Sequence, residues 1–161
     1  MFKKLFKIII IILIGGFIVI QFFRPERYST TEITNDDITK VLDVPGNVQG
    51  LLKRSCYDCH SNQTYWPWYS EIAPISWLIA DDVNGGRSKF NFSEWGKLSV
   101  SKQSTKLQKI CDKINGDESK IEGEPMPLPK YLILHKDKVL SKAEKEILCN
   151  WANTQADSLG N

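Results

Sequence analysis

The first feature of the hydrophobic pattern is an apolar run at positions 8–23, interrupted by Gln21 alone and preceded by a segment with three lysines. The run shows no amphipathic period, which argues against a helix buried in a protein core. Counted from Leu5, with about 1.5 Å per residue, it covers about 28 Å, close to the hydrocarbon thickness of a bilayer. We therefore expect one N-terminal transmembrane helix within residues 1–24.

This segment has the composition of a cleaved signal peptide or of an uncleaved signal-anchor. A cleavable signal closes with small residues, whereas this run closes with Phe22-Phe23-Arg24-Pro25, which favours the uncleaved anchor. Positive charge before the apolar run keeps the N-terminus in the cytoplasm. We therefore expect a single-pass protein of the inner (cytoplasmic) membrane, with its C-terminal domain in the periplasm or otherwise outside the cell.

The rest of the chain has the apolar spacing of helices. In residues 101–115 the apolar positions Leu107, Ile110, Cys111 and Ile114 recur at helical spacing, and Gly116 comes next as a stop. Residues 141–157 open with Ser and Glu three positions apart, which is a capping box. Further helices are expected at residues 48–55 and 74–84, the second ended by Gly85-Gly86.

Between these helices lie segments without a period. Residues 25–34 are polar and predict a tether that holds the domain off the membrane. Residues 56–67 and 116–129 are too long to be simple connectors. The expected fold is therefore all-α, a small helical domain at residues 35–157 with long ordered loops.

The charge of the chain excludes one class of partner. The 161 residues carry a net +2, but residues 1–24 hold four basic residues and no acidic one, so the remainder carries −2. Nucleic-acid binding needs a basic surface, so we expect no nucleic-acid partner. Four cysteines are too few for a disulfide scaffold of this length.

Two of the cysteines belong to Cys56-Tyr57-Asp58-Cys59-His60. C-x-x-C-H is the attachment sequence of c-type haem. Each thiol forms a thioether with one vinyl group, and the spacing brings both sulfurs to one edge of the porphyrin. The adjacent histidine then supplies an axial nitrogen to the iron. We expect one covalently attached haem c, held by Cys56 and Cys59, with His60 as a metal ligand.

Two other chemistries use cysteine pairs. A thioredoxin-like dithiol needs a strand before the motif, and no strand pattern precedes Cys56. A zinc site needs four ligands in paired groups, and the remaining candidates Cys111, Cys149 and His135 are widely separated.

Electron-transfer haem is usually six-coordinate, and few side chains are left for the second axial position. Apart from Met1 and His60, the only methionine and the only histidine in the chain are Met126 and His135. Met126 lies between two prolines in a stiff segment that fits no helix stripe, so we expect it to be the ligand, with His135 as the alternative and an open position as a third. A thioether ligand raises the reduction potential relative to two histidines.

The sequence resembles the haem-binding domain family of membrane-anchored bacterial proteins over about residues 35–155. The residues that carry the resemblance are Cys56-Tyr57-Asp58-Cys59-His60-Ser61-Asn62-Gln63-Thr64, Trp66-Pro67-Trp68-Tyr69, Pro74-Ile75-Ser76-Trp77, Gly86-Arg87, Asn91-Phe92-Ser93-Glu94-Trp95, Met126-Pro127, Tyr131, His135, Leu140-Ser141 and Trp151. The resemblance implies haem binding by a domain similar to class I cytochromes c.

Further residues are candidates around the haem. Trp77 and Trp95 are expected to wall the haem crevice and exclude water, unless they serve only as core. Arg87 is a candidate partner of a haem propionate, because its guanidinium suits carboxylates. Cys111 and Cys149 lie on the apolar faces of two predicted helices, either as buried thiols or as a disulfide.

Together these features predict a membrane-anchored monohaem c-type cytochrome that transfers one electron outside the cytoplasm, a carrier rather than an enzyme. Its redox partner proteins are not encoded in any motif. Two alternatives stay open: a haem-based peroxidase or ligand sensor with an open or displaceable sixth position, and a haem-free dithiol redox module.

Overall fold

The structure is a computed structural model and describes residues 2–116, 119 and 123–160. This part of the chain is helical and contains no strand, which confirms the all-α class. The longer elements are α1 (Phe2–Ile20), α3 (Gly46–Ser55), α5 (Ile75–Lys89), α6 (Val100–Asn115) and α8 (Lys142–Gly160). The shorter ones are α2 (Ile38–Val41), α4 (Tyr57–His60), η1 (Trp68–Glu71), η2 (Phe92–Lys97), α7 (Pro129–Leu132) and η3 (Lys136–Lys138).

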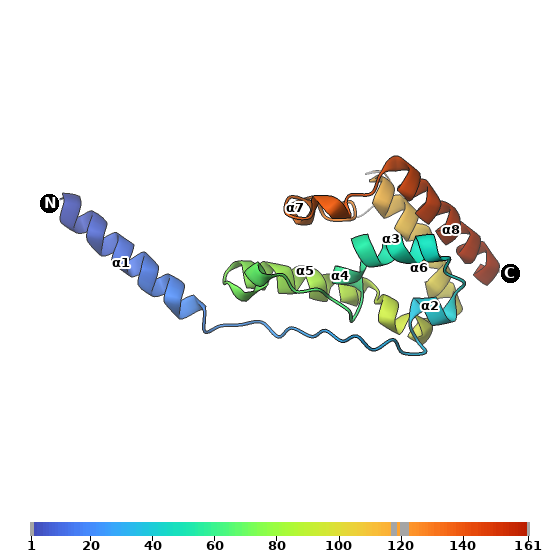
Figure 1. Cartoon of the computed structure of the whole chain (residues 1–161), viewed down its shortest axis with the longest axis horizontal. Coiled ribbons are helices and arrows are strands. Elements are labelled where there is room, and N and C mark those ends of the chain that lie inside the picture. The colour runs from blue at the N-terminus through green and yellow to red at the C-terminus, as the bar shows by residue number, and fades with distance from the viewer. Residues whose placement is uncertain (1, 117–118, 120–122, 161) are drawn as a thin grey trace.

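The core lies where α6 and α8 pack side by side against α3 and η2 (Figure 1). Leu107 and Ile114 on α6 and Leu148 on α8 are buried there, as the helical spacing predicts. The helix α6 ends at Gly116, whose φ of 70° is a left-handed cap. At the start of α8, Glu144 accepts from the backbone N–H of Ser141 at 2.8 Å, so the predicted capping box is present.

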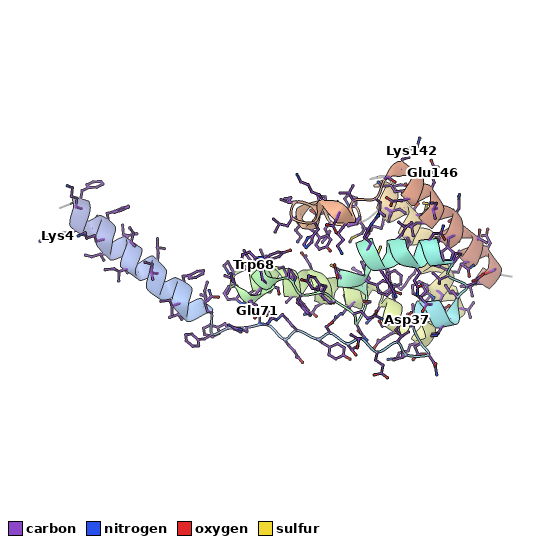
Figure 2. The ribbon with its side chains drawn as sticks, in the orientation of Figure 1. Lys4, Asp37, Trp68, Glu71, Lys142 and Glu146 are labelled. Atoms are coloured by element: carbon purple, nitrogen blue, oxygen red, sulfur yellow. A yellow bond between two sulfur atoms is a disulfide. The ribbon has the colours of Figure 1, made fainter. Side chains whose placement is uncertain are left out.

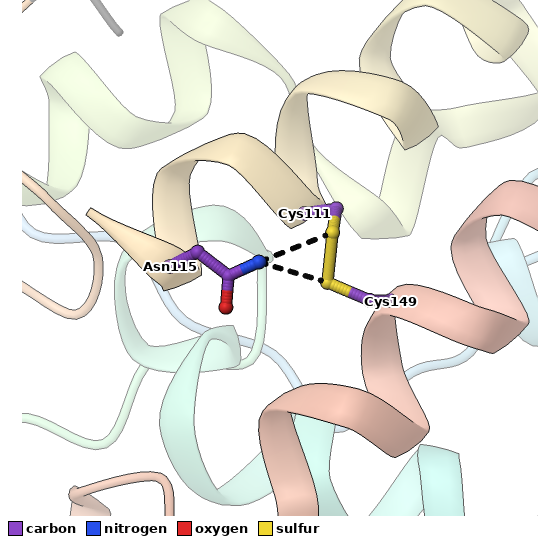
Figure 3. Close-up of a disulfide and its surroundings, with 3 residues drawn as sticks. All are labelled: Cys111, Asn115 and Cys149. Atoms are coloured by element: carbon purple, nitrogen blue, oxygen red, sulfur yellow. Dashed lines mark hydrogen bonds between the residues drawn. A yellow bond between two sulfur atoms is a disulfide. The ribbon is translucent and has the colours of Figure 1, made fainter. Parts of the chain in front are cut away.

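A disulfide joins α6 to α8 inside this core. The Sγ atoms of Cys111 and Cys149 are bonded, with their Cα atoms 4.8 Å apart (Figure 3). The side-chain amide of Asn115 lies 3.4 Å from each of the two sulfurs. Of the two alternatives left open for these cysteines, the structure has the disulfide.

The helix α5 is longer than predicted. It passes through Gly85-Gly86 and ends at Lys89 instead of stopping at residue 84. A Cβ at position 86 would lie 2.5 Å from the carbonyl oxygen of Cys59. The glycine therefore allows α5 to cross the Cys-x-x-Cys-His segment at close range, and it does not end the helix.

The N-terminal helix also differs from the prediction. Within residues 2–116, 119 and 123–160 no helix has the length and apolar character needed to cross a membrane, so the expected spanning helix is not found. The helix α1 has 19 residues, three of them lysines, and ends at Ile20, before Phe22 and Phe23.

Residues 25–34 have no helix, but they do not hang free. They run as an extended segment along the domain from α1 to α2 (Figure 1). The hydroxyl of Ser29 donates to the carbonyl of Thr64 at 2.7 Å, and the amide of Thr30 donates to the carbonyl of Asn62 at 2.8 Å. The predicted spacer is therefore bonded to the domain along its length. Of the two predicted long loops, the first contains α4, and the second lies partly outside the described residues at 117–118 and 120–122.

Candidate functional site

The Cys-x-x-Cys-His motif forms a short helical turn between α3 and the next loop. The amide of His60 donates to the carbonyl of Cys56 at 2.9 Å, and the amide of Cys59 donates to the same carbonyl at 3.2 Å. Residues three and four positions apart in such a turn share one face. The turn therefore presents Cys56, Cys59 and His60 on the same side.

That side faces a cavity of about 310 Å³. Cys56, Cys59 and His60 line it from one wall, and Met126 and His135 line it from the segment around α7. Apolar side chains of α5 and of the Met126 segment make up another part of the lining, among them Ile79, Val83 and Leu128, and the carboxylates of Asp58, Asp81 and Asp82 also line the cavity. The structure therefore brings together the two thiols, the imidazole and the thioether that the sequence analysis singled out.

The two cysteines of the motif are not bonded to each other. Burial, with the neighbouring Cys59 as a smaller cause, raises the pKa of Cys56 to about 12. Burial, with the nearby carboxylate of Asp58 as the next cause, raises the pKa of Cys59 to about 12. Both thiols are therefore protonated at neutral pH. Dithiol oxidoreductases depend on the opposite, a thiol whose pKa is lowered.

The imidazole of His60 is packed and oriented. Its ring stacks on Phe90 with 4.4 Å between centroids, and Nδ1 lies 3.3 Å from the carbonyl oxygen of Phe90. Burial lowers the pKa of His60, which favours the neutral ring. With Nδ1 donating to the Phe90 carbonyl, the lone pair is on Nε2, which is the tautomer that a metal-binding imidazole needs.

The second histidine at the cavity is fully hydrogen-bonded. Nε2 of His135 lies 2.8 Å from the hydroxyl of Tyr69, and Nδ1 lies 3.0 Å from the carbonyl oxygen of Tyr131. The ring also stacks on Tyr131, with 4.1 Å between centroids. Both ring nitrogens of His135 therefore already have partners within the protein.

A further contact joins the two walls of the cavity and was not predicted. The hydroxyl of Tyr131 donates to Oδ2 of Asp58 at 2.6 Å, and the ammonium of Lys138 lies 3.6 Å from the same oxygen. Burial raises the pKa of Tyr131, and the hydrogen bond to Asp58 raises it further, so this hydroxyl keeps its proton. Asp58 lies inside the motif, but nothing in the sequence pairs it with a residue 73 positions away.

Three predicted cofactor contacts lie elsewhere. Trp95 is fully buried in the core beside Phe90 and Phe92. Trp77 is 38% exposed and donates from Nε1 to the carbonyl of Phe23. Arg87 donates to the carbonyls of Ser61 and Tyr28 at 2.8 Å each, and to the hydroxyl of Thr64 at 2.7 Å, so it binds the extended N-terminal segment to the motif loop. None of the three is among the residues that line the cavity.

Comparison with family models matches the haem-binding domain over residues 15–154, which is most of the chain. The chain belongs to the haem-binding domain family. No curated protein and no solved structure matches it. Membership in the haem-binding domain family agrees with the resemblance found in the sequence. Haem is therefore the cofactor whose chemistry the cavity residues have to fit.

The cavity fits that cofactor in its donor chemistry. Two thiols at C-x-x-C spacing suit the two vinyl groups of one porphyrin edge, and His60 has a nitrogen lone pair for iron. The thioether of Met126 lines the same cavity from a different segment. The residues present therefore fit a haem attached through the motif.

Proposed function

We propose that the chain is a c-type cytochrome with one haem, attached covalently through Cys56 and Cys59, that transfers single electrons outside the cytoplasm. The observation that carries the proposal is the meeting of Cys56, Cys59, His60 and Met126 at one cavity. When bound, haem supplies an iron couple that changes by one electron. The protein supplies the attachment, the iron ligands and the apolar surroundings.

The two axial positions are inferred from the hydrogen bonding of the candidate ligands. His60 is the first ligand, since its Nδ1 bond to the Phe90 carbonyl leaves Nε2 for iron. His135 would have to break its bond to Tyr69 or to Tyr131 before it could bind a metal. The thioether of Met126 needs no such exchange, which favours Met126 as the second ligand.

The apolar part of the lining acts on the reduction potential. Ile79, Val83 and Leu128 are apolar residues that line the cavity beside the motif. A site of low polarity disfavours the more highly charged oxidised iron, and so raises the reduction potential. A thioether ligand acts in the same direction.

The place of action is part of the proposal. Three lysines precede the apolar run at residues 8–20 of α1, which is the charge order of an export signal and favours export of the domain that follows α1. The Cys111–Cys149 disulfide agrees with an oxidising compartment. We propose that α1, whose apolar side chains are exposed on all sides, attaches the domain to the outer face of the cytoplasmic membrane.

The attachment of haem can be tested with the two cysteine pairs of the chain. The full chain is produced with an export route and a cytochrome c maturation system, and a denaturing gel is stained for haem. Wild type should retain haem through denaturation, and Cys56→Ser/Cys59→Ser should lose it. The matched control, Cys111→Ser/Cys149→Ser, should retain it. A wild-type chain that loses its haem on denaturation contradicts the proposal.

The second ligand can be tested by spectroscopy of the same preparations. Oxidised wild type should show the near-infrared band of methionine bound to ferric haem, and Met126→Ala should abolish that band while His135→Ala keeps it. A wild-type spectrum of high-spin iron would favour the open-site alternative, a peroxidase or ligand sensor. Loss of the band in His135→Ala alone would contradict the assignment to Met126.

A further inference from the structure

The end of the domain nearest α1 presents apolar side chains to solvent. Trp68 on η1 is 75% exposed, and Ile75 and Leu78 on α5 are 43% and 63% exposed. Ile75 and Leu78 are three residues apart and lie on one side of α5. Phe22 and Phe23, next after α1 in the chain, are exposed as well. We call these five residues the apolar rim: Phe22, Phe23, Trp68, Ile75 and Leu78.

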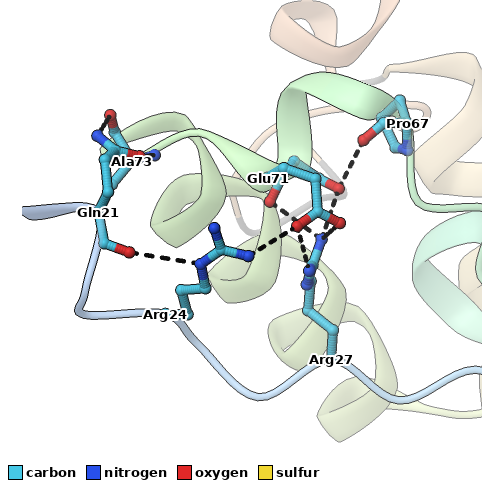
Figure 4. Close-up of polar contacts among 7 residues, drawn as sticks. Gln21, Arg24, Arg27, Pro67, Glu71 and Ala73 are labelled. Atoms are coloured by element: carbon cyan, nitrogen blue, oxygen red, sulfur yellow. Dashed lines mark hydrogen bonds and ion pairs between the residues drawn. The ribbon is translucent and has the colours of Figure 1, made fainter.

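Hydrogen bonds join the segment after α1 to the part of the domain that carries the rim. The side-chain amide of Gln21 donates to the carbonyl of Ala73 at 3.1 Å and accepts from the backbone N–H of Ala73 at 2.9 Å (Figure 4). Nε1 of Trp77 donates to the carbonyl of Phe23 at 2.6 Å. These bonds hold the last residues of the apolar run against α5 and the loop before it, so the rim lies next to the end of α1.

The charge at this end is also compensated. Glu71 lies beside Trp68 at the end of the domain that faces α1 (Figure 2). Arg24 reaches its carboxylate at 3.2 Å, and Arg27 reaches it at 2.7 Å. The hydrogen bond from Arg27 lowers the pKa of Glu71, which keeps the Glu71 carboxylate ionised. An unpaired carboxylate would repel anionic lipids, and the two arginines remove that barrier.

We infer that the apolar rim lies in the headgroup region of the bilayer that receives α1, so that the domain itself contacts lipid. The inference rests on the proposed attachment of α1. Tryptophan prefers this boundary, because its ring is apolar and its N–H can hydrogen-bond. Residues 25–34 are bonded along the domain and leave no slack to move the rim away.

Lipid contact at the rim orients the haem cavity. Pro67 and Tyr69 line the cavity and flank Trp68, and Ile79 lines it next to Leu78. A domain held by its rim therefore keeps the cavity beside the membrane surface and in one orientation. The partner that exchanges electrons with it would then be a protein that is itself at the membrane.

The inference is tested by photo-crosslinking of the full chain to lipid. The chain is reconstituted into vesicles of phosphatidylcholine and phosphatidylglycerol that carry a diazirine near the headgroup end of one acyl chain. After irradiation, lipid adducts are mapped by peptide mass spectrometry. We expect adducts on α1 and on residues 65–78. The peptide that carries Val100, an exposed residue outside the rim, should carry none.

Variants separate the rim from the helix. Trp68→Ser/Leu78→Ser should lower the adducts on Ile75 several-fold and leave those on α1 unchanged, whereas Val100→Ser should change neither. Adducts confined to α1 overturn the inference and leave the attachment of α1 intact. A chain without adducts on α1 overturns both. Cross-links between the rims of two chains would assign the rim to a second copy, and so overturn the lipid assignment. Haem attachment is read separately on the same samples, so its failure is distinguishable.

Discussion

The two cysteine pairs mark two regions of different physical character. Cys111 and Cys149 are bonded to each other in a core where α6, α8 and α3 bury apolar side chains. Cys56 and Cys59 are free thiols that line the cavity, together with Val83, Gly85 and Gly86 of α5. The first region is closed by the protein itself. The second is a cavity lined by two unbonded thiols, and cofactor sites are cavities of this kind.

The largest expected effect is on the closed region. Cys111→Ser/Cys149→Ser removes a cross-link that spans 38 residues, which should lower the free energy of unfolding by about 4 kcal/mol. Denaturant unfolding followed by circular dichroism measures this change. Haem attachment should persist in the same variant, because the cavity does not contain these cysteines. A variant as stable as wild type would contradict the stabilisation of the core by this disulfide.

The crossing of α5 over the motif provides a sharper test of the cavity region. Gly86→Ala places a methyl group against the carbonyl of Cys59, which should cost about 3 kcal/mol of unfolding free energy and reduce haem attachment. Gly50→Ala, inside α3, is the matched control, since its added Cβ meets no neighbouring side chain within 4 Å and the residue does not line the cavity. The control should be stabilised by up to about 1 kcal/mol through helix propensity. Equal behaviour of the two variants would contradict the close crossing.

The contact between the cavity walls should have a smaller effect. Tyr131→Phe removes the hydroxyl that donates to Asp58, which should cost about 1.5 kcal/mol because the acceptor is charged. The segment with Met126 should also bind iron less firmly, visible as a weaker near-infrared band. Tyr28→Phe, at an exposed tyrosine that does not line the cavity, is the control. An unchanged band and stability in Tyr131→Phe would show that the two walls are held together by other contacts.

The smallest effect concerns an ion pair that links α3 to α8. Arg54, with Ser141, lowers the pKa of Glu144 from 4.5 to about 2. A lowered folded-state pKa stabilises the fold above pH 4.5, and this contribution is lost as the pH falls towards 2. Glu144→Gln should therefore be less stable than wild type at neutral pH and equal to it near pH 2. Glu146→Gln, at a nearby position of α8, should have the stability of wild type throughout.

Local sequence rules predicted the closed region well. The spacing of Leu107, Ile110 and Ile114 predicted α6, and Ser141 with Glu144 predicted the start of α8. These signals are short-range, because helical periodicity and capping depend on residues within one or two turns. The sequence also singled out Cys56, Cys59, His60 and Met126, which line one cavity, because Cys, His and Met are rare in the chain.

The remaining features depend on contacts between distant segments. The predicted helix stop at Gly85-Gly86 was wrong, because a glycine in the sequence does not reveal that Cys59 lies against it. Residues 25–34 are hydrogen-bonded to the domain. The sequence did not predict these bonds, because the partners Asn62 and Thr64 lie more than 30 positions away. Arg87 donates to the backbone carbonyls of Ser61 and Tyr28. Every residue has such a carbonyl, so the residue types did not predict these partners.

Covalent attachment of one haem to the motif is tested most directly by the intact mass of the chain. The exported, haem-loaded protein is denatured in acid and its mass is measured, for wild type and for Cys56→Ser/Cys59→Ser. Wild type should exceed its sequence mass by one haem, and the variant should carry no added haem. A wild-type mass without haem, or with the addition preserved in the variant, would contradict this attachment.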